Sequence, residues 1–343
     1  MSTGLPRVSI LIPAYNAGPY LEALCRSIQA QTYQDFEVLI VNDGSTDHTL
    51  EVLAAFQNDQ RFRILSWQEN RGVSQATLAL FGLARGEFWC HPGADDVLTP
   101  QFIQERVSRL EANPHAAIMH GPAETINERG ERIESSGLKL DFPPEIPGAR
   151  AFRLLLQHNV IQTPSIMVRT SVTKSIMPFL ECDWKYAQDW YFWILHLATR
   201  FDLLWDARPL HKYRIHPESL TMVPSKFATR QAEIRLVPLC ALSRAAQFSA
   251  AASECWRTWR SRLYQLWLRR ACNLARNGGL NQEWMELGAS AYYGTPSKDT
   301  SLGSEVRKHF FGLVLTSWKE KRAQRNQRFQ VSGVAQMNDP LFR

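Results

Sequence analysis

The sequence contains no apolar run of the roughly 18–20 residues that a membrane-spanning helix requires. Its first seven residues pass directly into a strand-like segment, without the charged and then apolar layout of a signal peptide. We therefore expect the folded part of the chain to face the cytoplasm.

Cysteines are few and scattered. The chain has six, and none belongs to a CxxC pair. This spacing argues against a structural zinc site and against a disulfide framework, so we expect reduced and mostly buried thiols. Internal repeats and low-complexity tracts are also absent, and the best candidate for a domain boundary is a linker near residues 220–228.

The composition is that of a globular protein, with 45% hydrophobic and 21% charged residues. The net charge of +6 is unevenly distributed. Residues 1–220 hold 20 basic and 25 acidic side chains, whereas residues 221–343 hold 19 and 8. An acidic body followed by a basic region predicts two domains with different partners, 1–220 and 221–343.

Strand and helix signals alternate through the first hundred residues. Buried strands are predicted over 8–12, 36–41, 63–65 and 87–91, with apolar residues at helical spacing between them. This order predicts an α/β fold with a doubly wound, mainly parallel sheet. Ligands of such sheets bind beyond the carboxyl ends of the strands, and here polar turns follow Ile12, Val41 and His91.

The pattern is less regular after residue 100. A helix is predicted over 101–112, a strand over 163–168, an aromatic helix over 189–197 and a late strand over 210–215. The segment that ends near Pro147 gives no clear pattern. Beyond residue 221 the sequence is helical and rich in arginine, which predicts a helical C-terminal extension.

Five short motifs give the chain a family resemblance. They are Pro13-Ala-Tyr-Asn16, Val41-Asn-Asp-Gly-Ser-Thr-Asp47, Ala94-Asp-Asp96, Gln188-Asp-Trp190 and Tyr213-Arg-Ile-His216. Their order and spacing resemble those of family-two glycosyltransferases with the A-type (nucleotide-diphospho-sugar transferase) fold, over roughly residues 6–220. The resemblance implies an inverting, metal-dependent transferase that moves a sugar from a nucleotide diphosphate, most simply a UDP-sugar, to an acceptor hydroxyl in polysaccharide or glycoconjugate synthesis.

The first two motifs imply a site for the donor nucleotide. By resemblance, the Asp43 carboxylate accepts the uracil N3 proton, while Pro13, Tyr15 and Asn16 line the same pocket. Asp43 could instead organise an Asx-type turn. Asn16 could also cap a helix, and this role is compatible with donor binding.

The third motif implies a divalent cation site, for Mn²⁺ or Mg²⁺. Hard cations prefer carboxylate oxygens, and by resemblance Asp95 binds the ion, joined by His216. The family usually has an aspartate where this chain has Gly93. Asp96 would cap the next helix or take the metal in a shifted register.

The fourth motif implies the catalytic base. An inverting transfer needs one group to take the proton of the acceptor hydroxyl, and by resemblance this group is Asp189. Its place at a helix N-terminus favours the charged form, although it could be only a helix cap. Trp190 and Trp193 are expected to wall the acceptor pocket.

One further departure from the family pattern supports a rival function. Where the family often has Arg-Asn, this chain has Thr77-Leu78, and Arg71 is a candidate to replace the lost arginine. With Gly93, this departure keeps open a catalytically silent module that binds nucleotide sugars. A nucleotidyltransferase is disfavoured, because the segment after the first strand is not a basic, glycine-rich loop.

The basic C-terminal region alternates tryptophans with arginines over 256–276, and a second such stretch runs over 308–328. Helices of this kind can lie on an anionic membrane surface, which would suit a lipid-linked acceptor at the inner face of the membrane. Alternatively, they pack their tryptophans on the catalytic domain. No motif supports nucleic-acid binding.

Overall fold

The computed structural model describes residues 4–134, 142–180, 184, 186–219 and 227–258, and a mixed sheet of eight strands runs through this part of the chain. The strand order is β3-β2-β1-β4-β9-β6-β10-β8. The strands are β1 (Val8–Ala14), β2 (Phe36–Asp43), β3 (Phe62–Trp67), β4 (Phe88–Cys90), β6 (Ala116–His120), β8 (Glu145–Ile146), β9 (Met167–Arg169) and β10 (Asp202–Trp205).

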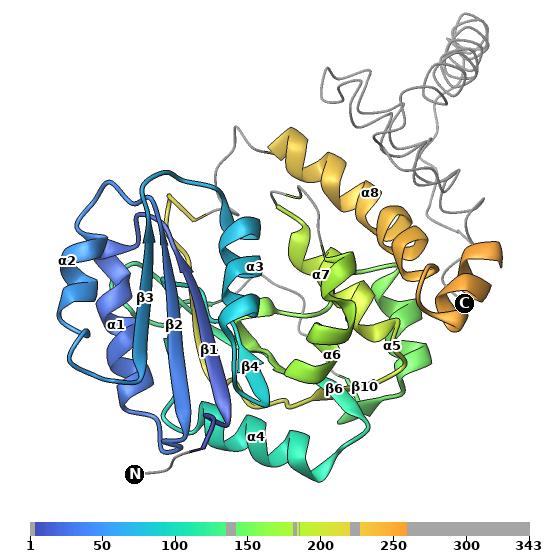
Figure 1. The fold of residues 1–343 in the computed structure, drawn as a ribbon, viewed down its shortest axis with the longest axis horizontal. Helices are drawn as coiled ribbons and strands as arrows, with labels where there is room; N and C mark the ends of the chain where they lie inside the picture. Colours follow the sequence, from blue (N-terminus) through green and yellow to red (C-terminus); the bar gives the residue numbers. More distant parts are fainter. Residues whose placement is uncertain (1–3, 135–141, 181–183, 185, 220–226, 259–343) are drawn as a thin grey trace, which may run out of the picture. The chain divides into compact units, whose positions relative to one another are not determined.

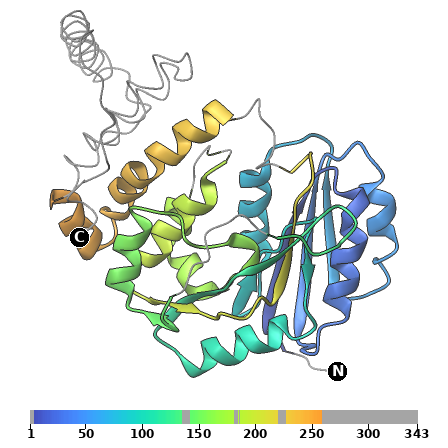
Figure 2. The same ribbon diagram turned by 180° about the vertical axis from the view of Figure 1, so that it is seen from behind.

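The first half of the sheet is parallel, as the sequence predicts. Strand β1 pairs in parallel with both β2 and β4, and β2 pairs in parallel with β3. The connections are the helices α1 (Gly18–Gln29), α2 (Thr49–Ala54) and α3 (Val73–Leu83). Figure 1 shows these four strands side by side, with α1 and α2 together on one side; Figure 2 shows the same layers from behind.

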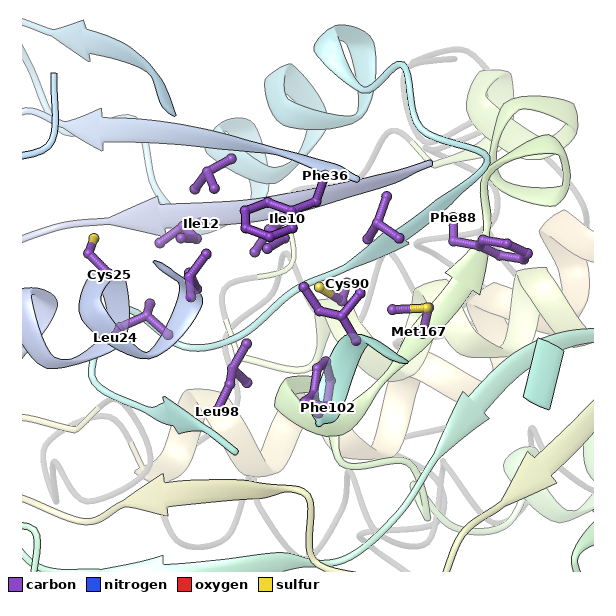
Figure 3. Close-up of a cluster of buried hydrophobic side chains, with 14 of the residues drawn as sticks. Ile10, Ile12, Leu24, Cys25, Phe36, Phe88, Cys90, Leu98, Phe102 and Met167 are labelled. Carbon is purple, nitrogen blue, oxygen red and sulfur yellow. The ribbon is translucent and has the colours of Figure 1, made fainter. Parts of the chain in front are cut away.

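One face of this parallel half carries the main hydrophobic core. Val8, Ile10 and Ile12 of β1 pack with the buried face of α1 and with α4 (Phe102–Ala112) (Figure 3). Leu11 is equally buried but lies outside this cluster, because successive side chains of a strand point to opposite faces of the sheet. Helix α3, which contacts β1 and β2, covers part of that second face.

The second half of the sheet is mixed. Strand β9 runs antiparallel to both β4 and β6, and β8 runs antiparallel to β10. The predicted strand over 163–168 is wrong in its first half, where Thr163–Ser165 form the 3₁₀ turn η1. Pro164 has no N–H to give to a ladder and its fixed φ suits the first turn of a helix, so the strand begins only at Met167.

A small second sheet lies at the end of β4, and one of its three strands comes more than 100 residues after β4 in the chain. It has the order β5-β11-β7, from Val97–Leu98, His211–Arg214 and Ala123–Ile126. Strand β11 pairs antiparallel with β5 and parallel with β7. The late strand predicted over 210–215 is therefore present, whereas β5 and β7 were not predicted.

The remaining helices surround α7 (Gln188–Leu197), which is buried over most of its surface. Helix α7 contacts α5 (Gly148–Leu155), α6 (Thr170–Ile176) and α8 (Phe227–Ala245), and α8 lies alongside it in Figure 1. A 3₁₀ turn, η2 (Met177–Phe179), follows α6. The segment over 250–258 is helical as well, which agrees with the predicted helical extension as far as the structure describes it.

Helix α8 is tied to α7 by a buried carboxylate. The backbone N–H groups of Tyr186 and Ala187 donate to Oε2 of Glu233, at 2.6 and 2.9 Å. Glu233 is fully buried, and negative charge at this position complements the N-terminal end of α7. Residues after position 226 therefore contribute to holding the start of α7, and a domain boundary at residue 220 stays a prediction.

Two observations on the described residues concern the cysteines and the length of the helices. The four described cysteines are free, with Cys25 and Cys90 buried and Cys240 and Cys255 partly buried. None of the described helices is both long and apolar enough to cross a membrane. The two basic-aromatic stretches lie outside the described residues, except for positions 256–258 of the first stretch.

We expect Glu233→Ala to destabilise the fold. The change leaves one buried and one partly buried N–H group without this acceptor, at a cost of about 2–5 kcal/mol in the free energy of unfolding. Urea unfolding measures the loss, and Glu233→Gln, which keeps one carbonyl oxygen, should fall between the alanine variant and the parent. Glu254→Ala removes an exposed carboxylate paired with Arg257 and serves as the control. Equal unfolding midpoints for the two alanine variants would contradict this role of Glu233.

Candidate functional site

The loops after β1 and β2 are joined at the carboxyl edge of the sheet. Asn16 adopts a left-handed conformation with φ of 49°, and its Oδ1 accepts a hydrogen bond from the Thr46 N–H at 2.8 Å. Its own N–H donates to Ser45 Oγ at 3.0 Å. Asn16 therefore connects the two loops and is not the cap of α1, whose N-cap is Ala17. Tyr15, beside it, is 50% exposed and free to meet a ligand.

Asp43, the last residue of β2, is only 2% exposed. Its two carboxylate oxygens accept hydrogen bonds from the backbone N–H groups of Arg71 and Gly72, at 2.7 and 2.8 Å. Gly72 has φ of 89°, which a residue with a side chain rarely adopts. Asp43 thus organises the loop before α3, and these bonds to residues 28 and 29 positions later are not the local Asx-type turn that was the alternative to a nucleobase contact. A nucleobase contact stays a prediction and would use the remaining lone pairs of these oxygens.

The first turns of α3 also contact two other segments near the carboxyl edge of the sheet. We call residues 72–77 the α3 N-terminal segment. The Ser74 hydroxyl lies 2.5 Å from the Trp184 carbonyl oxygen and also contacts the side-chain amide of Gln188, the residue before Asp189. Thr77 Oγ1 lies 3.2 Å from Nε2 of His91, at the end of β4. The α3 N-terminal segment therefore contacts Asp43 at the end of β2, Gln188 at the start of α7 and His91 at the end of β4.

These contacts account for one departure from the family pattern. Thr77 is buried and paired with His91, whose pKa burial lowers to about 4, so the imidazole is neutral near pH 7. A polar but uncharged pair thus occupies the place of the family arginine. The Arg71 guanidinium instead lies over the Trp67 ring, 4.7 Å from its centre.

Asp95 and His216 meet although 121 positions separate them. Nε2 of His216 lies 3.0 Å from Oδ2 of Asp95. The small second sheet makes this possible, because β5 follows Asp95 and pairs with β11, which ends at Arg214. The Arg214 side chain donates to the backbone oxygen of Asp95 at 2.7 Å, and the Tyr20 ring packs against His216 at 4.6 Å between ring centres. The sequence motif identified His216 but gave no signal for Tyr20.

Asp96 has a structural role. It is fully buried, and its carboxylate accepts the N–H groups of Gly93 and Arg214 at 3.1 and 3.0 Å. Burial, and next the neighbouring charge of Asp95, raise the pKa of Asp96. Both expectations for this residue, a helix cap or a metal ligand in shifted register, find no support in these contacts.

Gly93 is fitted closely into this turn. A Cβ atom at position 93 would lie 2.6 Å from Oδ1 of Asp95 and 2.8 Å from Oδ2 of Asp96. An aspartate at this position, as the family usually has, would require both carboxylates to move. Glycine at position 93 is therefore the residue that the local packing of this turn accommodates.

The chemistry of the Asp95–His216 pair fits a divalent cation. A carboxylate oxygen and an imidazole nitrogen are common ligands, and cations of this kind often take only one or two protein side chains together with substrate phosphates. Within the described residues no cluster of three or more His, Cys, Asp or Glu side chains is placed to hold an ion. A cation here would therefore need the donor diphosphate or water as further ligands.

Asp189 lies in the first turn of α7 and is surrounded by neutral donors. Its Oδ2 accepts the Thr163 hydroxyl at 2.9 Å and the Asn159 amide at 3.3 Å, and its Oδ1 accepts the N–H of Trp190 at 2.6 Å. Desolvation raises the pKa of Asp189, against the opposite effect of these hydrogen bonds. A carboxylate of raised pKa with defined orientation is suited to take a proton.

The predicted role of the two tryptophans is wrong. Trp190 and Trp193 are 5% and 1% exposed, and their indole N–H groups donate to the Leu155 carbonyl oxygen and to Thr163 Oγ1. Both belong to the packing around α7 and do not wall an open pocket.

Two cavities lie away from these residues. One, of about 280 Å³, is lined by Arg150, Arg153 and neighbours on α5, and the other, of about 340 Å³, lies at the start of β10. Neither contains a predicted site residue. We therefore assign the site from the hydrogen bonds at the carboxyl edge of the sheet.

The sequence matches known glycosyltransferases. The Glycosyl transferase family 2 model matches residues 9–176. An uncharacterized glycosyltransferase of Haemophilus influenzae is 31% identical over 222 residues, which cover 64% of this chain and 68% of that protein. Chondroitin synthase of Pasteurella multocida is 35% identical over 130 residues, but these cover 38% of this chain and only 13% of that enzyme.

Solved structures match the fold at low identity. S. aureus TarS 1–349 in complex with UDP-GlcNAc gives a TM-score of 0.57 at 15% identity, over 92% of each chain. The mannosyltransferase PcManGT from Pyrobaculum calidifontis, in complex with GDP-Man and Mn²⁺, gives a TM-score of 0.51 at 15% identity, over 94% of this chain and 85% of that one. The predicted fold class and family resemblance are both confirmed.

We expect Gly93→Ala to displace the carboxylates of the Asp95–Asp96 turn. Asp96 is held by a backbone N–H and cannot yield freely, so the free energy of unfolding should fall by about 1–3 kcal/mol. Gly82→Ala, in α3, is the matched control, because a Cβ there meets no atom within 4 Å and alanine favours a helix. Thermal unfolding compares the two. A Gly93→Ala protein as stable as the parent would show that the turn accommodates a Cβ atom at position 93.

Proposed function

The chain belongs to glycosyl transferase family 2, and we propose that it transfers a sugar with inversion from a nucleotide diphosphate donor to an acceptor hydroxyl. One observation carries the proposal. The α3 N-terminal segment hydrogen-bonds Asp43, the Gln188 side chain next to Asp189, and His91 at the end of the strand before Asp95. The proposed nucleobase, cation and base residues, Asp43, Asp95 and Asp189, thus lie on segments that are each contacted by residues 72–77.

The donor would bind over the loops after β1 and β2. Tyr15 is exposed there, and Asn16 and Asp43 fix the loop conformations. We propose a UDP-sugar as donor. TarS, whose fold this chain shares, was solved with UDP-GlcNAc, whereas PcManGT was solved with GDP-Man, so a panel of both nucleotides tests the choice.

Asp95 and His216 are the proposed ligands of a divalent cation, Mn²⁺ or Mg²⁺. When bound, the cation would supply positive charge to the diphosphate as it leaves. Nε2 of His216, which lies 3.0 Å from Oδ2 of Asp95, would bind the cation through its lone pair. The Arg214 side chain, through its bond to the Asp95 carbonyl oxygen, holds the loop in place.

Asp189 is the proposed base. Its carboxylate takes the proton of the acceptor hydroxyl while that oxygen attacks the anomeric carbon from the face opposite the diphosphate. The bond between the anomeric carbon and the phosphate oxygen breaks, and the configuration inverts. A single base suffices, because a diphosphate can leave without being protonated.

A catalytically silent module that binds nucleotide sugars is the second candidate, and Gly93 and Thr77 favour it because both depart from the family pattern. The two candidates differ in turnover. Manganese-dependent release of UDP from a UDP-sugar supports the transferase, whereas calorimetric binding without release supports the silent module.

For the acceptor we propose a sugar or lipid-linked sugar of a surface polysaccharide or glycoconjugate. The relatives include chondroitin synthase, which supports polysaccharide synthesis as the setting. An acceptor carried by a lipid would place the enzyme at the cytoplasmic face of a membrane. The basic region after residue 256 is the proposed contact with anionic lipid headgroups.

We expect Asp189→Asn to bind donor like the parent and to lose transfer by a factor on the order of 100 or more, because the amide cannot take the proton. Calorimetry measures donor binding, and UDP release measures transfer. Asp35→Asn, an exposed position before β2 at the opposite edge of the sheet, is the matched control and should stay active. Undiminished transfer by Asp189→Asn would remove this residue from its assigned role.

The pH dependence of transfer should reveal the environment of Asp189. Its raised pKa means that the ionised base is lost, as the pH falls, at a higher pH than for an exposed aspartate, whose pKa is about 3.9. The acid limb of kcat/KM should therefore lie above that value, in a range where circular dichroism shows the protein folded. If the residual activity of Asp189→Asn has the same acid limb, another group is responsible for it.

A further inference from the structure

A threonine hydroxyl connects the proposed base to the hydrophobic core. The Thr163 hydroxyl, in η1, lies 2.9 Å from Oδ2 of Asp189 and 3.2 Å from Nε1 of Trp193. An indole N–H can only donate, so Thr163 Oγ1 accepts from Trp193. The hydroxyl proton is then left to be donated to the Asp189 carboxylate.

Both ends of this connection are held firmly. Trp193 is 1% exposed and stacks on Trp89, with 6.1 Å between ring centres and 19° between the ring planes. At the other end, Oδ1 of Asp189 accepts the N–H of Trp190. The orientation of the Asp189 carboxylate is therefore set at both oxygens. Backbone fixes Oδ1, and the side chains of Thr163 and Asn159 fix Oδ2, with Thr163 making the shorter contact.

We propose that Thr163 is a positioning residue for transfer: Trp193 sets the direction of its hydroxyl, and the hydroxyl holds Oδ2 of Asp189 so that the carboxylate faces the acceptor. The inference rests on the proposed function of Asp189 as the base. Loss of this contact leaves only the longer bond from Asn159 on Oδ2. The carboxylate then samples orientations from which it does not reach the acceptor proton.

A second threonine with the same contacts provides a matched control. Trp89 Nε1 donates to Thr173 Oγ1 at 2.8 Å, and the same oxygen lies 2.8 Å from Nε2 of His196 in α7. Thr173 thus also accepts from a buried indole and also hydrogen-bonds a side chain of α7. Its partner is a neutral histidine whose pKa burial lowers to about 4, not Asp189.

The experiment compares Thr163→Val, Thr163→Ser and Thr173→Val in steady-state transfer and in calorimetric donor binding. Thr163→Val should lower kcat roughly 10- to 100-fold, the cost of misplacing a catalytic group by about 1 Å, with donor affinity unchanged. Thr163→Ser, which keeps the hydroxyl, should restore most of kcat. Thr173→Val should keep the kcat of the parent. Thr163 is only half-buried, and Thr163→Ala gives the same test should valine impair folding.

Three results would overturn the inference: a parental kcat in Thr163→Val, an equal fall of kcat in Thr173→Val, or a serine variant as slow as the valine variant. These differ from failure of the proposed function. If Asp189→Asn transfers sugar normally, the base is wrongly assigned. If Asp189→Asn is inactive while Thr163→Val is fully active, the base stands and only the role of Thr163 is wrong.

Discussion

The site depends on the way a single stretch of backbone is held at the carboxyl edge of the sheet. In the α3 N-terminal segment, Gly72 donates to Asp43 and the Ser74 hydroxyl bonds the Gln188 side chain. One turn further on, Thr77 meets His91 at the end of β4. These contacts satisfy polar groups in a partly buried region, where leaving them unpaired would cost about 1–3 kcal/mol each. The loops after β2 and β4 and the start of α7 are therefore fixed by the same segment.

Around this segment the chain completes the site with parts that are distant in sequence. The small second sheet brings His216 to Asp95, and α8 contributes Glu233 to the start of α7. The Asp95–Asp96 turn is closely packed, since a Cβ atom at Gly93 would lie 2.6 Å from Oδ1 of Asp95 and 2.8 Å from Oδ2 of Asp96. Beside this turn the Thr77–His91 pair is neutral near pH 7, because burial lowers the pKa of His91 to about 4.

The sequence predicted those parts of the fold and site that depend on local patterns. Buried strands read as apolar runs, and a polar residue directly after such a run must lie at the carboxyl edge, which placed Asp43 correctly. Ser74, Thr77 and Thr163 could not be found this way, because a hydroxyl in a helical or strand-like pattern gives no sign of its partner. Strands β5 and β7 were also missed, since both are short and their pairing with β11 is decided by contacts across about 90 residues or more.

The most direct test of the account is a crystal structure of the protein with a UDP-sugar and Mn²⁺. The uridine should lie over the loops after β1 and β2, the diphosphate and cation at Asp95 and His216, and the anomeric carbon should be open to a hydroxyl beside Asp189. A donor bound with its sugar directed away from Asp189, or a cation held by other residues, would contradict the account.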